Sequence, residues 1–340
     1  MNQKKFNITF LSILIALTSI IIIYYLYQKN TNQDLTNSPK ENKKLSTALP
    51  TLPFFLNQVI KPELEKQMKN IKLEIVANNN NYEGSLNLLL KDKETIAELD
   101  CHLPWASNRL RDIQSSEKIE VLLPFYFAKF SMFGRKDPNT INKIQDKIDK
   151  IQNNENPDKP LKILILGEKS QKTLTLRFLE QLKLIQRKTV EKDDGLSKDK
   201  LFNLTTGDFE IDEKKINFVD EGTQTNEIFN KFRGDNSYDV FISYPATTGI
   251  SNIGQNIEII KTLELPASPN DPIWAFCISL IAKKENSEDN KKVLEKIKEF
   301  LQNESLIQPF FQKNENFLFK IDSSLITQVT KNINSYFNND

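Results

Sequence analysis

The stretch Lys159–Ile185, KPLKILILGEKSQKTLTLRFLEQLKLI, decides the fold. Its first part, PLKILILGE, is an almost unbroken apolar run, which is typical of a parallel strand that is buried on both faces. Its second part, from Lys172 onward, has apolar residues at helical spacing. A buried strand followed directly by an amphipathic helix is the repeating unit of α/β sheets, so the stretch predicts an α/β protein.

Strand-like and helical runs continue to alternate on both sides of this stretch. Upstream lies the β-rich run IKLEIVA, at 71–77. Downstream lie the strand-like KINFVDE, the helical TNEIFNKFRG and the strand-like YDVFISY and IWAFCISLIAKK, at 215–221, 225–234, 238–244 and 273–284. This alternation predicts parallel sheets with helices on both faces. Two polar segments are predicted to lie outside this alternation. The first, 139–159, carries a short amphipathic helix at 141–152 and then an Asn-rich linker, and the second, 186–208, is an exposed excursion.

Two turn-rich segments, Gly134–Pro138 and Leu265–Pro272, flank the middle of the chain. They suggest that the chain passes into a second lobe at the first segment and returns at the other, which predicts two lobes joined by two connections. We assign residues 45–132 to lobe 1, 133–267 to lobe 2, and 268–340 to the return into lobe 1 and a C-terminal helix.

The N-terminus predicts the compartment. Phe6–Tyr27 carries no charge, and about 22 residues at ~1.5 Å each span about 33 Å, which matches the hydrocarbon core of a bilayer. Lys4 and Lys5 precede the run, so the rest of the chain is expected on the extracytoplasmic side of the cell membrane, behind a single transmembrane helix. A cleaved signal peptide is the competing interpretation. Residues 1–28 are therefore the anchor or signal, and the polar residues 29–44 a flexible tether.

Composition removes several classes of function. The 46 Lys and Arg residues balance 45 Asp and Glu residues to a net charge of +1, which argues against a nucleic-acid partner. The chain has one histidine, His102, and two cysteines, Cys101 and Cys277, so zinc sites and Cys/His catalytic pairs are nearly excluded. We expect no metal, no cofactor and no enzymatic activity. Both cysteines lie in apolar contexts and are predicted to be buried free thiols, with one disulfide as the alternative.

Four stretches, in order, resemble one known family. They are residues 73–100, 159–185, 216–250 and 270–310. Together they make the chain from about Leu45 to Phe311 similar to the NlpA family, the methionine-binding lipoproteins that feed an ABC importer.

The resemblance implies a type II periplasmic-binding fold, in which two α/β lobes close on a small ligand. It also implies an extracytoplasmic solute-binding protein whose partners are an ABC permease and its ATPase. The expected solute is a small amino acid, methionine-like, or a short peptide with an apolar part. The alternative is a surface interaction protein that retains the fold and has lost the ligand pocket.

The family's carboxylate-binding side is altered in this chain. The arginine that binds the ligand carboxylate in the family falls on Leu174, and Arg177, one turn further along the predicted helix, is the available replacement. The family asparagine before that helix falls on Gln171. The two asparagines of its N-G-N element fall on Ser243 and Pro245. These departures leave methionine itself open as the solute.

The other predicted ligand contacts are mostly aromatic. Tyr82 matches the family tyrosine after the second strand, and the family's aromatic cluster falls on residues 102–105, where Trp105 keeps a large ring and His102 supplies a polar one. Ser243 and Tyr244 end an apolar strand, where open α/β sheets bind ligands. The full set of predicted ligand-binding residues is Tyr82, His102, Trp105, Gln171, Arg177, Ser243 and Tyr244.

Overall fold

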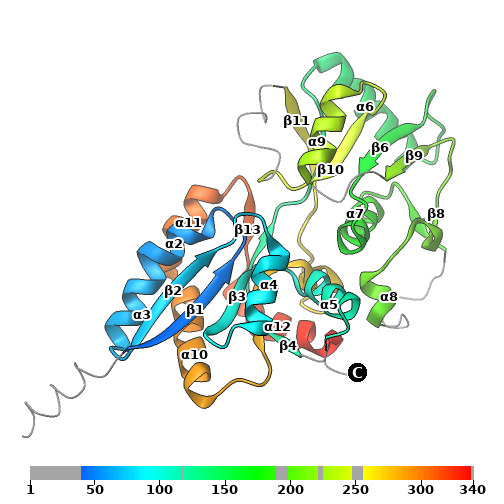
Figure 1. The fold of residues 1–340 in the computed structure, drawn as a ribbon. Coiled ribbons are helices and arrows are strands. Elements are labelled where there is room, and N and C mark those ends of the chain that lie inside the picture. Colours follow the sequence, from blue (N-terminus) through cyan, green and yellow to red (C-terminus); the bar gives the residue numbers. More distant parts are fainter. Residues whose placement is uncertain (1–39, 116–117, 189–197, 221–224, 247–255, 338–340) are drawn as a thin grey trace, which may run out of the picture.

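The computed structural model describes residues 40–115, 118–188, 198–220, 225–246 and 256–337. These residues form two α/β lobes, each built around its own sheet (Figure 1). Lobe 1 contains both ends of the described chain, and lobe 2 contains its middle part. The two-lobed α/β architecture predicted from the sequence is therefore confirmed.

Lobe 1 is built on a six-stranded sheet in the order β13-β4-β12-β3-β1-β2. Its strands are β1 (Glu41–Thr47), β2 (Ile71–Ala77), β3 (Thr95–Cys101), β4 (Ile119–Ala128), β12 (Ile278–Lys283) and β13 (Leu318–Lys320). Strand β1 pairs in parallel with β2 and β3, whereas β12 runs antiparallel to β3 and β4. The carboxyl ends of β1, β2 and β3 consequently meet at one edge of the sheet.

Lobe 2 is built on a five-stranded sheet in the order β11-β5-β10-β6-β9. Its strands are β5 (Ser131–Arg135), β6 (Leu161–Ile165), β9 (Ile216–Asp220), β10 (Val240–Ser243) and β11 (Ile257–Thr262). Strand β6 is parallel to β9 and β10, while β5 is antiparallel to β10 and β11. A separate two-stranded ribbon pairs β7 (Gln186–Arg187) with β8 (Phe209–Glu210). Both main sheets are thus mixed rather than purely parallel.

Helices cover both sheets. In lobe 1 they are α2 (Leu52–Phe55), the π-turn η1 (Leu56–Ile60), α3 (Lys61–Gln67), α4 (Tyr82–Lys91), α5 (Leu103–Asp112), the 3₁₀ turn η4 (Pro272–Phe276), α10 (Glu288–Gln302), α11 (Glu304–Asn314) and α12 (Ser323–Phe337). In lobe 2 they are α6 (Pro138–Gln152), α7 (Lys169–Gln181), α8 (Lys198–Phe202), the 3₁₀ turn η3 (Thr206–Asp208) and α9 (Thr225–Gly234).

The lobes share a hydrophobic core. One cluster of buried side chains includes Leu86 and Leu110 of lobe 1 together with Leu174 and Phe178 of lobe 2. Helices α5 and α7 contact each other, and α7 also contacts η4. The two halves therefore pack against one another along α7. A second cluster fills the opposite face of the lobe 1 sheet, beneath α3, α10 and α11.

Two predicted boundaries are wrong by a few residues. Strand β1 begins at Glu41, inside the segment predicted as tether. Its charged residues find hydrogen-bond partners within the fold: the ammonium group of Lys43, a residue that is 5% exposed, donates to Asn290 and to Glu41. Strand β5 lies wholly in the lobe 2 sheet, so that lobe begins at Ser131 rather than at residue 133.

Two element predictions also need correction. The run 273–284 is not one strand, since Pro272–Phe276 forms a 3₁₀ turn whose cap, the Asp271 side chain, accepts from the Ile273 N–H. Segment 186–208 is not simply exposed, because Leu201, Phe202 and Leu204 are buried. The amphipathic helix predicted in segment 139–159 is confirmed: it is α6, which buries an apolar stripe against β5 and β6.

Among the described residues, none of the helices combines the length and the apolar character that a bilayer crossing requires. The predicted anchor at residues 1–28 lies outside the described residues.

Candidate functional site

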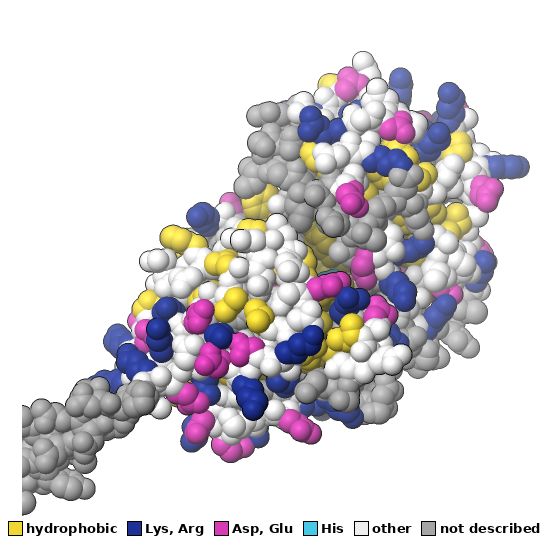
Figure 2. Space-filling view, viewed as in Figure 1, with side chains coloured by type: hydrophobic (Ala, Val, Ile, Leu, Met, Phe, Trp, Pro, Cys, Tyr) yellow, Lys and Arg dark blue, Asp and Glu magenta, His cyan; other side chains and the backbone are white. Residues whose placement is uncertain are grey.

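The candidate site lies where the two lobes meet. Strands β1 and β3 of lobe 1, and β6 and β10 of lobe 2, end at this junction, and ligands of open α/β sheets bind beyond the carboxyl ends of their strands. Apolar side chains are visible in the recess between the lobes (Figure 2). At one side of the junction a cavity of about 400 Å³ is lined from α5 by Asn108 and Arg111 and from lobe 2 by Lys169, Lys172 and neighbouring residues.

Aromatic residues from both lobes gather at the junction. Tyr82 opens α4, and its ring lies 6.1 Å from that of Trp105 on α5, in an edge-on arrangement. Tyr244, directly after β10, lies with its ring 4.9 Å from Phe130. Burial raises the pKa of Tyr244, and the nearby Glu168 and Tyr82 raise it further, so lobes 1 and 2 both contribute to its surroundings. Burial also raises the pKa of Tyr126 of β4, and the nearby Tyr82 and Asp100 raise it further.

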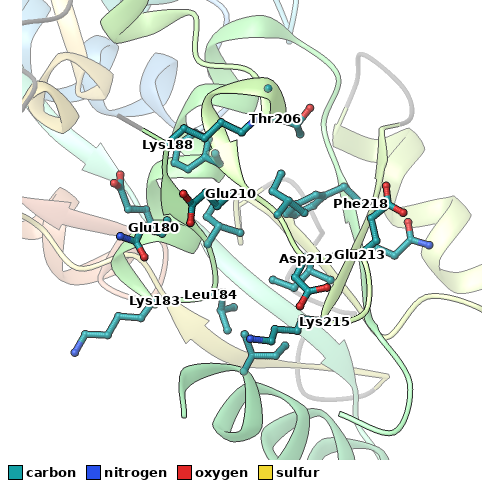
Figure 3. A pocket seen from close by; sticks show the side chains of 18 of the residues that line it. Glu180, Lys183, Leu184, Lys188, Thr206, Glu210, Asp212, Glu213, Lys215 and Phe218 are labelled. Atoms are coloured by element: carbon teal, nitrogen blue, oxygen red, sulfur yellow. The ribbon is translucent and has the colours of Figure 1, made fainter. Parts of the chain in front are cut away.

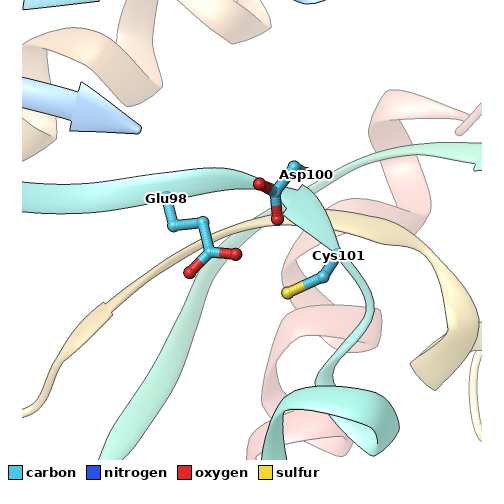
Figure 4. Close-up of side chains that lie close together, drawn as sticks. All are labelled: Glu98, Asp100 and Cys101. Carbon is cyan, nitrogen blue, oxygen red and sulfur yellow. The ribbon is translucent and has the colours of Figure 1, made fainter. Parts of the chain in front are cut away.

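Two buried acids stand behind these rings. Glu98 and Asp100 of β3 are 0% exposed, and together with Cys101 they place one ligand atom each within 4.8 Å of the others (Figure 4). One oxygen of Asp100 accepts from the Ala48 N–H at 2.6 Å. Its other oxygen and both oxygens of Glu98 have no hydrogen-bond partner among the described residues. They lack a donor only when both groups are ionised: a proton kept by one carboxyl group is shared with the other, and Asp100 also interacts with the Ser85 hydroxyl.

The electrostatics of the pair follow from its burial. Burial, and then the charge of its neighbour, raise the pKa of Glu98, and burial also raises the pKa of Asp100. Burial and the two acids likewise raise the pKa of the Cys101 thiol. Within the described part of the chain neither acid forms an ion pair with Lys or Arg. Two carboxyl groups and a thiol are possible metal ligands, but the raised thiol pKa disfavours the thiolate that a metal needs.

The positive end of α7 is already occupied by the chain itself. The Glu168 side chain caps this helix, accepting from the N–H groups of Ser170 at 3.1 Å and Gln171 at 2.9 Å and from the Ser170 hydroxyl. A helix N-terminus stabilises a carboxylate through its unpaired N–H groups and its dipole. A ligand carboxylate expected at this helix would have to displace the carboxylate of Glu168.

His102 has a structural partner at the junction. Its Nδ1 accepts from the Trp105 N–H at 3.3 Å and so caps α5, and its ring lies 5.3 Å from that of Phe276. Burial lowers the pKa of His102 to about 4, although Glu168 acts in the opposite direction. The imidazole is consequently neutral near pH 7.

The predicted site residues divide into two groups. Tyr82, His102, Trp105 and Tyr244 lie together at the junction, as the contacts above show. Arg177 does not join them: it is 4% exposed, and its guanidinium donates to the Leu201 carbonyl oxygen at 3.1 Å inside lobe 2. Two helical turns separate it from the start of α7, and its role as the carboxylate partner stays a prediction.

Two further predicted residues lie at element ends in lobe 2. Ser243 is the last residue of β10, and Gln171 is in the first turn of α7. The Ser243 hydroxyl and the Gln171 Oε1 are buried and have no hydrogen-bond partner among the described residues.

Sequence reasoning missed Glu98, Asp100, Tyr126 and Glu168. A signal for the acids was present, because two carboxyl groups interrupt IAELDC, a run that otherwise reads as a buried strand. The predicted burial of Cys101 and Cys277 as free thiols is confirmed.

A second cavity lies elsewhere, in lobe 2. It has a volume of about 1390 Å³ and lies at the outer edge of the lobe 2 sheet, beside β9 and the β7–β8 ribbon (Figure 3). Its rim mixes cations such as Lys183 and Lys215 with acids such as Glu180 and Glu213. All of the residues that line this cavity belong to lobe 2, so we place the candidate site at the lobe junction, where both lobes contribute side chains.

Comparison with known proteins agrees with the two-lobed architecture. A YaeC-family lipoprotein from Enterococcus faecalis is 14% identical and superposes with a TM-score of 0.57 over 83% of this chain and all of that one. The chain has the fold of the YaeC-type lipoproteins. The methionine-binding protein MetQ is 13% identical, with a TM-score of 0.57 over 83% of this chain and 98% of that one.

A third similar structure is an ABC transporter periplasmic substrate-binding protein from Coxiella burnetii, which is 14% identical with a TM-score of 0.53 over 82% of this chain and all of that one. No protein-family model and no curated protein sequence matches the chain. The resemblance to methionine-binding lipoproteins that the sequence predicted is thus confirmed at the level of the fold, and the low identities fit a divergent sequence.

Proposed function

We propose that this protein is the solute-binding component of an ABC importer, that it acts outside the cytoplasm, and that it binds a small solute between its lobes. The observation that carries the proposal is the convergence of Tyr82 and Trp105 from lobe 1 with Tyr244 from lobe 2 at the lobe junction. A solute held by residues of both lobes stabilises the closed arrangement over the open one, which is the usual basis of hinge closure.

The similar structures support the transport role. One of them is a methionine-binding protein and another a substrate-binding protein of an ABC transporter. In our proposal the closed form docks on a permease, and a separate ATPase supplies the energy, so this chain performs no covalent chemistry. The anchor proposed at residues 1–28 would keep the domain at the extracytoplasmic face of the cell membrane.

Around Tyr82 and Trp105, the described residues offer partners for the apolar part and the ammonium group of an amino acid, but not for its carboxylate. Its apolar part would find aromatic walls in Tyr82 and Trp105, and its ammonium group would find acceptors in Glu98 and Asp100. Its carboxylate would meet Glu168 at the start of α7, while Arg177 is engaged with Leu201. The amine end of the predicted solute therefore fits better than the carboxylate end.

The occupation of the α7 terminus by Glu168 also favours a second candidate function. A chain that supplies its own carboxylate at the family's anion-binding position is what a pocket that has lost its ligand would contain. On this alternative the protein is a surface interaction protein that retains the fold.

The experiment that separates the two functions is mass spectrometry of small molecules released from the full chain, purified in a mild detergent. A stoichiometric solute that is lost in Tyr82→Ala and kept in the exposed-residue control Phe54→Ala supports transport. A chain that carries no solute, and that also shows no heat of binding with amino acids, dipeptides and amines, supports the interaction protein.

A further inference from the structure

The cavity of about 400 Å³ at the lobe junction has a cationic lining. Arg111 of α5 lines it from lobe 1, and Lys169 and Lys172 line it from the first turn of α7 in lobe 2. Asp112 is the one acid among the described residues of the lining, which therefore carries a net charge of +2. A concave surface with an excess of one sign of charge concentrates ions of the opposite sign.

The buried part of this lining joins the two lobes directly. Helices α5, α7 and α8 meet on this side of the junction (Figure 1). The side-chain amide of Asn108 on α5 donates to the Asn203 side-chain oxygen at 3.2 Å, and the Asn108 oxygen accepts from the Arg111 guanidinium. Leu204, the next residue after Asn203, donates its N–H to the Thr173 hydroxyl of α7 at 2.9 Å. Asn108 is only 8% exposed, so the partner that orients the guanidinium is itself fixed in the interior.

The cations come from opposite lobes and share one cavity. Like charges that share a small cavity repel each other, and within the described part of the chain Lys169 forms no ion pair. An anion shared between the lobes would offset this repulsion, and the guanidinium fork of an arginine binds phosphate or carboxylate oxygens in pairs. The volume lies at the lower end of the range for small-molecule pockets, about 300–1,000 Å³, which suits a compact ligand.

We infer that this cavity is a binding site for a small dianion, whose oxygens are shared between Arg111 of lobe 1 and Lys169 and Lys172 of lobe 2. The class comprises phosphate monoesters and compact dicarboxylates, because both supply two negative charges and oxygens that a guanidinium fork accepts. The bound dianion stabilises the packed arrangement of the lobes, because only that arrangement presents all three cations to one ligand.

This site is separate from the place proposed for the solute. Tyr82, Trp105 and Tyr244 are not among the described residues that line the cavity. Dianion binding therefore does not depend on the function proposed above.

The test is isothermal titration of the full chain in detergent, at low ionic strength, with inorganic phosphate, glycerol 3-phosphate and succinate. Acetate and L-methionine are titrated in parallel as a monoanion and a zwitterion. We expect at least one dianion to bind more tightly than acetate and L-methionine, and the comparison of the phosphates with succinate identifies which source of charge the site prefers. Arg111→Gln and Lys169→Gln should each weaken that dianion about five- to fiftyfold, since each removes a hydrogen bond between charged groups. Both residues are exposed, so both variants are expected to fold.

Arg109→Gln is the matched control. It removes the same charge from the same helix, but Arg109 pairs with Glu83 at 3.0 Å and is not among the described residues of the cavity lining. Binding should stay within about twofold of the unchanged protein. A saturating dianion should also raise the melting temperature of the unchanged protein and of Arg109→Gln, but not that of Arg111→Gln.

Dianion binding that is no tighter than acetate binding, or that both cavity variants leave unchanged, would overturn the inference. A loss in only one of the two variants would also overturn it, because the ligand would then contact a single lobe. L-methionine binding without any dianion binding would remove this site and leave the transport function standing. Dianion binding that needs Arg111 and Lys169, in a chain that binds no other solute, would keep this site while the solute site proposed at Tyr82 and Trp105 fails.

Discussion

Thr173 of α7 is expected to hold the α8 segment in place. Its hydroxyl donates to the Phe202 carbonyl oxygen at 2.9 Å and accepts from the Leu204 N–H at 2.9 Å, and the side chain is fully buried. Thr173→Val keeps the shape of the side chain but leaves both backbone groups without that partner. A buried polar group that loses its partner costs about 1–3 kcal/mol, so two such groups should lower the free energy of unfolding by about 2–6 kcal/mol.

Thr175, two residues further along the same helix, is the matched control. It is equally buried, but its hydroxyl donates to the Gln171 carbonyl one turn back, at 2.9 Å. A carbonyl inside a helix already accepts a backbone N–H, so Thr175→Val strands no backbone group. We expect this variant to lose less than about 1 kcal/mol.

The two variants are compared by urea denaturation and by amide hydrogen exchange. The Leu204 N–H should lose protection in Thr173→Val and keep it in Thr175→Val, because only the first variant removes its acceptor. Equal stability losses in the two variants, or an unchanged exchange rate at Leu204, would refute the assignment of Thr173 as the anchor of α8.

Three other perturbations test the lobe junction and the lobe 2 core. Phe202 of α8 reaches across to lobe 1, with its ring 6.0 Å from Phe276 and 5.5 Å from Tyr336. Phe202→Ala should therefore loosen the junction and increase the radius of gyration in X-ray scattering, whereas the control Phe54→Ala, whose ring is 70% exposed, should leave it unchanged. Arg135 stacks 4.1 Å from the Phe232 ring centre and donates to the carbonyls of Tyr238 and Asp235, both at 2.7 Å. Arg135→Lys cannot reproduce this fork and should lose about 2–4 kcal/mol in chemical denaturation; a loss below about 0.5 kcal/mol would contradict the reasoning. Burial raises the pKa of Glu98 in the folded chain, so the unfolded chain releases this proton first as the pH rises and the folded state loses stability above about pH 4.5. Glu98→Gln should therefore melt at a higher temperature than the unchanged protein at pH 8, with the difference shrinking towards pH 4.5; a constant difference across this range would show that the carboxyl does not titrate as proposed.

The overall fold is accessible from sequence because its strands are distinctive. Runs such as Leu161–Ile165 and Val240–Ser243 are apolar and short, and each is flanked by a helix with clear periodicity. Local pattern is enough to predict such units, and the order of the units predicts two lobes.

The errors have a common physical origin in contacts between distant segments. The segment 186–208 looks polar, yet Thr173 of α7 hydrogen-bonds to the backbone of Phe202 and Leu204, whose side chains are buried. The hydrogen bond of Arg177 is equally hidden from local spacing, because the α8 backbone that accepts it lies 24 residues later in the chain. Neither partner can be identified from local spacing.

The candidate site was only partly predictable for the same reason. Tyr82 and Trp105 can be singled out in the sequence by their large rings. The importance of Glu98 depends instead on which charged groups pack beside it. Whether a cation lies beside Glu98 depends on all the elements packed around β3, and no single stretch of sequence contains that information.

The entry point of the chain into lobe 1 has a consequence for how the protein would work at a surface. Strand β1 starts at Glu41 and runs towards the lobe junction, so its seven residues separate the entry point from the candidate site by about 23 Å at ~3.3 Å per residue. An attachment upstream of Lys40 would hold the end of lobe 1 that lies far from the junction and leave lobe 2 able to move relative to it. The lobe junction would then lie on the side of lobe 1 away from the point of attachment.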